Sequence, residues 1–301
     1  MNRPAPHPLL DPAIVARIER AARVHLGRPW RSHGFTSLDE RSSHPCGIFH
    51  GRRLSIFAKL GPAREQFTAE LAGLRFLRQR AGIPTPEPVA GGLIDLPGGA
   101  LLLFEALPER LPAARQPRDW RSIGHLLATV HQVRDAQFGF GQGNFFGPLP
   151  QDNRPAATWP DFYRERRLIP LLRAATDSGH LPADLAAGVA RIAERLPALS
   201  GPDPQPSLLH GDAQQNNFIS TAGGPVVIDA CPYFGHPEID LAQVDFFQPV
   251  PADLFAAYRD IAPIAPGFAD RRELWRLATY LAVVTVGGPL RGLADAVRRY
   301  A

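Results

Sequence analysis

Five hydrogen-bonding side chains follow an apolar run in the segment LLHGDAQQNNF, residues 208–218. Asp212 precedes Asn217 by five residues, and a second carboxylate, Asp229, ends the apolar run PVVID. Phosphoryl transfer requires such a set, because one carboxylate orients the acceptor hydroxyl while an amide and another carboxylate hold Mg²⁺. A turn stabilised by aspartate hydrogen bonds would explain one of these residues but not all three. The spacing therefore predicts a phosphoryl-transfer site in this loop.

Lys59 is the only lysine in a sequence that has 33 basic residues. A compact ammonium donates to phosphate oxygens in several directions, whereas the guanidinium of arginine is a planar fork. Glu70 lies beside the apolar stripe of a predicted helix, so it can turn toward the strand that carries Lys59. Two interpretations stay open: an ion pair beneath a nucleotide phosphate, or an exposed pair without a function.

The elements that position these residues follow from hydrophobic periodicity. A strand over residues 52–60 carries Lys59, and a helix over residues 64–81 carries Glu70. Two strands flank the turn PGG, the second over residues 100–104. Three more short strands surround the polar loop, over residues 206–210, 216–220 and 225–229. Further helices are predicted over residues 119–133, 159–179 and 183–196, and Pro170 is expected to kink the second.

Prolines concentrate in residues 108–117, which predicts a lobe boundary there. We place a nucleotide-binding lobe at residues 1–107 and a catalytic and acceptor-binding lobe at residues 108–301. The glycine-rich residues 138–153 match no phosphate-binding motif and follow no predicted strand, so we interpret them as a loop. His125 and His131 lack metal-ligand spacing and are interpreted as core or surface residues.

Composition excludes several functional classes. The formal net charge is only +4 and no basic tail is present, which argues against nucleic acid as a partner. No apolar run reaches the roughly 18 residues of a membrane span, and the first residues do not resemble a signal peptide. Cys46 and Cys231 form no CxxC motif or disulfide framework. We therefore expect a globular, cytoplasmic protein, whose oligomeric state the sequence leaves open.

Two segments, HGDAQQNN and VVIDACPYFGHPEIDLA, resemble the catalytic and metal-binding segments of the aminoglycoside phosphotransferase and choline kinase superfamily. Residues 138–168 are similar to its fructosamine kinase (ketosamine 3-kinase) branch. The resemblance implies an α+β, two-lobed protein-kinase-like fold, with a small β-rich N-terminal lobe and a larger, mostly helical C-terminal lobe. It also implies ATP-dependent, Mg²⁺-dependent phosphorylation of a sugar hydroxyl, with a small ketosamine as the acceptor.

The resemblance also assigns roles to residues. It makes Asp212 the catalytic base and Asn217 and Asp229 the Mg²⁺ ligands. Residues that would contact ATP are the phosphate-holding pair Lys59 and Glu70, the hinge residues Glu105 and Leu107, and Ser42, Ser43 and His44 in the nucleotide-covering loop.

The sequence departs from the family at the acceptor side. Gln214 replaces the tryptophan expected near the sugar, so hydrogen bonding replaces an aromatic face. Tyr233, His236 and Glu238 follow a metal ligand and are candidate pocket residues, with a purely structural loop as the alternative. An aminoglycoside, amino sugar or amino alcohol acceptor therefore stays open, as does an inactive kinase-like binding module. Asp212 itself is expected to be ionised at pH 7, as an unperturbed aspartate is.

Overall fold

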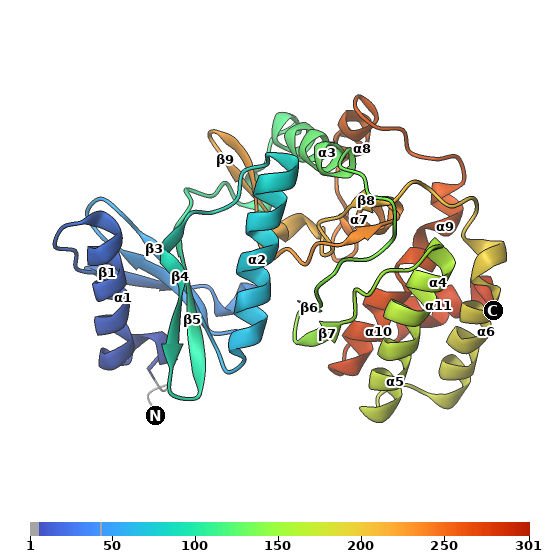
Figure 1. The fold of residues 1–301 in the computed structure, drawn as a ribbon, viewed down its shortest axis with the longest axis horizontal. Coiled ribbons are helices and arrows are strands. Elements are labelled where there is room, and N and C mark those ends of the chain that lie inside the picture. Colours follow the sequence, from blue (N-terminus) through green and yellow to red (C-terminus); the bar gives the residue numbers. More distant parts are fainter. Residues whose placement is uncertain (1–5, 43) are drawn as a thin grey trace.

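The N-terminal part of the chain is built on a five-stranded antiparallel sheet, at the left of Figure 1. The structure, a computed structural model, describes residues 6–42 and 44–301. The strands follow the order β1-β2-β3-β5-β4. They span Gly34–Ser37 (β1), Cys46–His50 (β2), Ile56–Gly61 (β3), Pro88–Leu96 (β4) and Gly99–Glu105 (β5).

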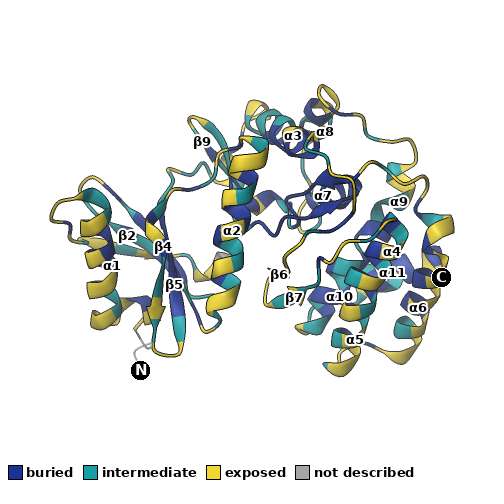
Figure 2. Ribbon diagram, viewed as in Figure 1, coloured by how far each residue is buried: buried dark blue, intermediate teal, exposed yellow. Residues whose placement is uncertain are grey.

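One helix covers each face of this sheet. Alternate side chains of a strand point to opposite faces, so Leu101 and Leu103 of β5 pack toward helix α1 (Pro12–Leu26). Leu102 and Phe104 pack instead toward helix α2 (Arg64–Ala81). The central residues of β5 are therefore buried on both sides, as Figure 2 shows for the interior of this lobe. The predicted helix over residues 64–81 is present, whereas the sequence patterns gave no expectation for α1.

The C-terminal part is mostly helical and lies at the right of Figure 1. Its helices are α3 (Pro117–His131), α4 (Trp159–Tyr163), α5 (Ile169–Asp177), α6 (Ala183–Leu199), α7 (Glu238–Gln243), α8 (Ala252–Arg259), α9 (Phe268–Trp275), α10 (Leu277–Thr285) and α11 (Arg291–Tyr300). Short antiparallel pairs join β6 (Asn144–Phe146) to β7 (Leu149–Gln151), β8 (Ser207–Leu208) to β11 (Phe234–Gly235), and β9 (Phe218–Thr221) to β10 (Gly224–Val227). This arrangement agrees with the expected α+β, two-lobed architecture.

One sequence prediction needs correction. Residues 138–153 are not a plain loop, because β6 and β7 form a hairpin within them. The helix expected over residues 159–179 is present, and it contains a π-helical turn, Arg164–Leu168, which ends two residues before Pro170. Proline has no backbone N–H to donate, so a change of helical hydrogen bonding at this place has a local cause.

Helix α2 joins the two parts of the molecule. It lies between the N-terminal sheet and the C-terminal elements in Figure 1. A single core cluster contains Phe67 and Leu74 of α2 together with Trp120 of α3 and Phe218 of β9. The division at residues 107 and 108 stays a prediction, because this core is continuous across it. Within the residues that the structure describes, no helix has the length and hydropathy needed to cross a bilayer.

Candidate active site

The polar loop joins β8 to β9 and is shaped by Gly211. This residue has φ +86°, in the left-handed region that favours glycine, and an added Cβ would lie 2.1 Å from the carbonyl oxygen of Cys231. The loop therefore turns sharply where no side chain fits. Asp212, the next residue, is carried into the cleft by this turn.

A buried carboxylate, Asp240, fixes the backbone of the polar loop. The sequence analysis gave this residue no role. Asp240 of α7 is fully buried and accepts the backbone N–H groups of His210 at 2.6 Å and Gly211 at 3.1 Å. His131 Nε2 lies 3.1 Å from the same carboxylate, and its Nδ1 lies 2.7 Å from the hydroxyl of Tyr258. His131 is thus a core residue, as expected, but one that supports the loop. Asp240 lies in the segment VVIDACPYFGHPEIDLA, which carries part of the family resemblance.

His210 fixes the backbone of the loop on its other side. Its Nε2 lies 3.1 Å from the carbonyl oxygen of Ile228, and its Nδ1 accepts the backbone N–H of Asp212 at 3.2 Å. One ring nitrogen must donate and the other accept, which is the pattern of a neutral imidazole. Burial lowers the pKa of His210 and so favours this form.

Asp212 is surrounded by amide donors. Asn217 Nδ2 donates to the Asp212 carbonyl oxygen at 2.9 Å and to Oδ2 at 3.1 Å, and Gln214 Nε2 lies 3.3 Å from Oδ2. Burial raises the pKa of Asp212 to about 7, and the nearby charge of Asp229 adds to this increase. The expectation that Asp212 titrates as an ordinary aspartate is therefore wrong, because that expectation did not include burial.

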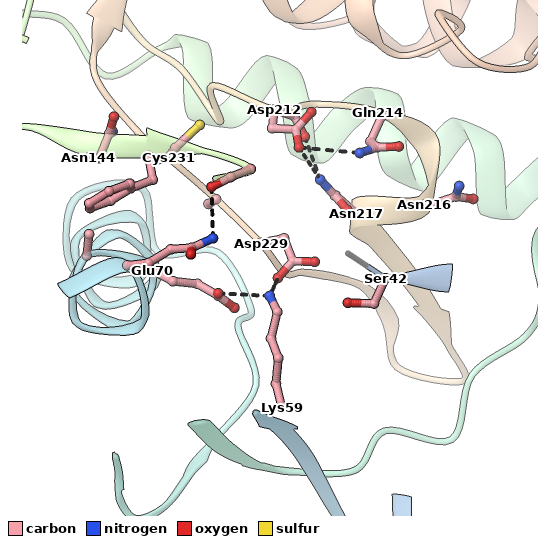
Figure 3. A pocket seen from close by; sticks show the side chains of 15 residues that line it. Ser42, Lys59, Glu70, Asn144, Asp212, Gln214, Asn216, Asn217, Asp229 and Cys231 are labelled. Carbon is pink, nitrogen blue, oxygen red and sulfur yellow. Dashed lines mark hydrogen bonds and ion pairs between the residues drawn. The ribbon is translucent and has the colours of Figure 1, made fainter. Parts of the chain in front are cut away.

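Lys59 meets two carboxylates that come from different lobes (Figure 3). Its Nζ lies 3.0 Å from Glu70 Oε2, on α2, and 2.8 Å from Asp229 Oδ1, after β10. The ion pair expected between Lys59 and Glu70 is present, and Lys59 is only 6% exposed, so the exposed alternative is excluded. Asp229 has φ +50°, a conformation that aspartate tolerates better than most residues.

We call Lys59, Glu70 and Asp229 the Lys59 trio. The two carboxylates share one ammonium, and this arrangement shifts the pKa values of all three groups. Burial opposes the charge of Lys59, but Asp229 and Glu70 outweigh it and hold the pKa of Lys59 above its usual range. Burial raises the pKa of Glu70. Burial acts in the same direction on Asp229, but contact with Lys59 prevails and keeps the pKa of Asp229 below its usual range.

The trio separates two neighbouring pockets. One, which we call the polar pocket, has a volume of about 220 Å³ and is drawn in Figure 3. The other, which we call the apolar pocket, has a volume of about 150 Å³. The residues that line the polar pocket but not the apolar one include Asn144, Phe145, Asp212, Gln214 and Cys231. The residues that line only the apolar pocket include Ile48, Phe104, Ile219 and Ile228. Both are lined by Ser42, Lys59, Glu70, Asn216, Asn217 and Asp229.

The residues expected to contact the nucleotide divide among three positions. Glu105 and Leu107 line the apolar pocket, and Ser42 lines both pockets. His44 lines neither and packs against the ring of Phe67, with ring centroids 5.6 Å apart. Ser43 lies outside the described residues.

Three of the four candidate acceptor residues are not in the polar pocket. Gln214 lines it, whereas Tyr233, His236 and Glu238 are buried in the C-terminal part, with exposed fractions of 2%, 5% and 2%. Glu238 accepts hydrogen bonds from Arg271 and from Trp275 Nε1. The alternative for these three, a structural loop, is what the structure shows, because neighbouring aromatic rings enclose them.

The polar pocket also contains residues that sequence reasoning missed. Asn144, Phe145 and Gly147 belong to the β6–β7 hairpin, and Gln66 of α2 donates from Nε2 to the Gly147 carbonyl oxygen at 2.8 Å. The two strands of this hairpin have three residues each, so the sequence offered no alternating pattern to find them. Because they were interpreted as a loop, no residue of the segment was proposed for the site.

Comparisons with known proteins agree with this geometry. A sequence model of the fructosamine kinase family matches residues 15–290. A Synechocystis protein named "probable ketoamine kinase" is 34% identical over 282 residues, 90% of either chain. The chloroplastic protein-ribulosamine 3-kinase of Oryza sativa is 30% identical over 262 residues, 85% of this chain and 74% of that protein.

Solved structures extend the likeness to three dimensions. A structure described as a fructosamine-3-kinase from Thermobifida fusca superposes with a TM-score of 0.79 at 28% identity, over 96% of this chain and 98% of that one. An aminoglycoside phosphotransferase superposes with a TM-score of 0.60 at 18% identity, over 93% of this chain and 96% of that one, and shows the fold alone. The kinase-like, two-lobed fold expected from the sequence is confirmed.

Proposed function

The chain belongs to the fructosamine kinase family, and from that premise we propose that it transfers the γ-phosphoryl group of ATP to a sugar hydroxyl of a ketosamine. The observation that carries this proposal is the position of the Lys59 trio between two unlike pockets. An apolar space suits a nucleobase, and a polar space suits a sugar. Phosphoryl transfer needs both to meet at one cationic side chain.

The apolar pocket suits adenine. Phe104, Ile219 and Ile228 offer apolar walls from both lobes, and Glu105 and Leu107 bring the backbone between the lobes to the same space. Lys59, at the inner end, would hold the phosphates, because its ammonium lies where the two pockets meet. Ser42 lines both spaces and would contact phosphate through its hydroxyl.

Asn217 and Asp229 fit a magnesium ion. Asn217 uses Nδ2 to donate to Asp212, which leaves its Oδ1 as a metal ligand, and Asp229 contributes a carboxylate. Two protein ligands are enough for Mg²⁺ bound with ATP, because phosphate oxygens and water complete its coordination. When bound, the ion neutralises charge that develops on the phosphates.

Asp212 would orient the acceptor hydroxyl and take its proton. It lines the polar pocket, and the amide donors Asn217 and Gln214 hold its carboxylate in place. In a loose phosphoryl transition state the hydroxyl proton leaves late, so positioning of the acceptor contributes more than the strength of the base. Gln214 would add a hydrogen bond to the sugar from the same loop.

A second acceptor class is supported by one observation. Gln214 presents an amide where the family usually has tryptophan, and an amide also suits an aminoglycoside, an amino sugar or an amino alcohol. An inactive binding module is disfavoured, because Lys59, Asp212, Asn217 and Asp229 all line one cleft.

The test is ATP consumption by the purified protein with Mg²⁺, against fructosamines, ribulosamines, free amino sugars, aminoglycosides and amino alcohols. We expect turnover with ketosamines and none with Asp212→Asn. Turnover with another class alone would replace the ketosamine in this proposal. Bound ATP without turnover on any acceptor would support the binding module.

A further inference from the structure

Arg115 is a buried cation in the proline-rich segment 108–117, and the proposed reaction leaves it without a role. Only 7% of the residue is exposed. A turn over Pro112–Ala114 sets its backbone, and the centre of its guanidinium lies 4.9 Å from the centroid of the Trp120 ring on α3. A charged group that is removed from water needs strong hydrogen-bond partners. The groups that Arg115 contacts therefore show what it holds in place.

The acceptors of Arg115 lie on both sides of Asn217. Nη1 donates to the carbonyl oxygen of Gln215 at 3.0 Å, and Nη2 donates to the carbonyl oxygen of Phe218. Nε donates to Ser220 Oγ at 3.0 Å. A side chain from the segment that connects the two lobes therefore fixes the backbone before and after a proposed Mg²⁺ ligand.

The register of β9 explains why this backbone needs a donor from Arg115. The carbonyl oxygen of Asn217 accepts the N–H of Ile228 at 3.0 Å, so Asn217 bonds toward the side of β10. Successive residues of an antiparallel strand bond toward opposite edges, so the carbonyl of Phe218 faces the outer edge of the pair. The segment 110–115 covers this edge with one backbone hydrogen bond of 2.7 Å and with the guanidinium of Arg115.

We propose that Arg115 positions Asn217 as a Mg²⁺ ligand by fixing the carbonyl groups before and after it. The inference rests on the proposed function and adds a positioning residue to it. On its other side Asn217 is bonded to Ile228, the residue before Asp229. Asn217 is thus held from both sides, and its separation from Asp229 is set before the metal binds. Ligands that are already in place bind an ion more tightly than ligands that must be ordered on binding.

A guanidinium suits this role better than an ammonium does. Its donors form a rigid planar fork, and three of them reach acceptors that are spread over residues 215–220. The ring of Trp120 adds a cation–π contact from α3. The ammonium of a lysine would keep the charge, but it could not reach all three acceptors from one position.

The test measures how Mg²⁺ affects nucleotide binding rather than turnover. Calorimetric titration of the full-length protein with AMP-PNP, a non-hydrolysable ATP analogue, is done once with Mg²⁺ and once with EDTA. We expect Arg115→Lys to weaken binding about tenfold with Mg²⁺, as is typical when a residue that orients a metal ligand is changed. Binding with EDTA should stay nearly the same. Thermal unfolding shows that the variant is folded, and Arg115→Gln, which also removes the charge, should give the same pattern.

The matched control is Arg110→Lys, a change of the same kind in the same segment. The guanidinium of Arg110 pairs with Asp119 at 2.6 Å, whereas its contact with β9 is made by its backbone N–H, which the substitution keeps. We expect AMP-PNP to bind this variant as it binds the wild type, with Mg²⁺ and with EDTA.

A double-mutant cycle tests whether Arg115 acts through Asn217. In an Asn217→Ala background the positioned ligand is already absent, so Arg115→Lys should cause no further loss of AMP-PNP binding with Mg²⁺. An equal loss in both backgrounds would overturn the positioning role, because Arg115 would then act independently of Asn217.

The outcomes separate the inference from the proposed function. If Mg²⁺ tightens AMP-PNP binding equally in the wild type and in folded Arg115→Lys, the positioning role is overturned and the proposed function stands. If Mg²⁺ does not affect AMP-PNP binding by the wild type, the proposed metal ligands are overturned and this inference with them.

Discussion

The two pockets on either side of Lys59 are built in different ways. Several apolar walls of the apolar pocket are strand residues, such as Ile48 of β2, Phe104 of β5 and Ile219 of β9. The polar pocket is lined by loops, a short hairpin and one face of α2. Strands hold apolar side chains at fixed spacing. Such rigid walls suit the flat adenine base, which is the same in every ATP-dependent kinase. Loops can change their side chains without disturbing a core, which suits an acceptor that differs between relatives.

The largest effect is expected from Asp212→Asn. This change keeps the shape of the side chain but removes its capacity to accept a proton, so we expect kcat to fall by about 10²–10⁴-fold. Binding of ATP in the apolar pocket should be unchanged, because Asp212 does not line it. Single-turnover kinetics and titration with ATP measure the two quantities. A near wild-type kcat would remove Asp212 from its proposed role.

Lys59→Arg tests the side chain that both pockets share. Lys59 is buried and donates to Glu70 and Asp229, and a planar guanidinium cannot keep both contacts within the same space. We expect kcat/KM for ATP to fall by about a hundredfold, from the loss of charge-assisted hydrogen bonds. Thermal unfolding of the variant provides the folding control. Unchanged kinetics would show that the single lysine has no special function.

Ile219→Asn should affect the apolar pocket alone. Ile219 lines this pocket and not the polar one. Loss of its apolar contact with the base should raise KM for ATP by about tenfold, while KM for the acceptor stays the same. Steady-state kinetics with each substrate varied in turn checks this. An equal increase in both KM values would mean that the two pockets do not act separately.

Gln214→Trp changes the polar pocket without changing the apolar pocket. It restores the aromatic residue that the family usually has in this loop, and stacking on a sugar would lower KM for a ketosamine by about two- to tenfold. KM for ATP should not change, because Gln214 lines only the polar pocket. If the variant instead loses activity on every acceptor, the amide of Gln214 is needed to orient Asp212.

Much of the site could be predicted because its residues are local in sequence. Asp212 and Asn217 lie five residues apart, and their hydrogen bond of 3.1 Å needs only the turn between them. Lys59 and Glu70 lie on a strand and the helix that follows it, so periodicity alone could bring them together. The same reasoning failed for Tyr233, because proximity along the chain to a metal ligand does not determine the face to which a side chain turns.

Local patterns were also sufficient for most regular elements. Helix α2 ends at Ala81 and is capped by Gly82, which has φ +66°, and the stripe that includes Phe67 and Leu71 predicted its length. The β6–β7 hairpin was missed because its strands have three residues each, too few to show an alternating pattern.

The amino-acid sequence by itself determined the reaction class and the family, since these depend on residue types at short, fixed spacings. Only the tertiary structure decided two other properties: the contact of Lys59 with Asp229, 170 residues away, and the raised pKa of Asp212. Each of these depends on burial and on groups brought together from distant parts of the chain. Desolvation and long-range contacts arise when the lobes pack, and no local pattern contains them.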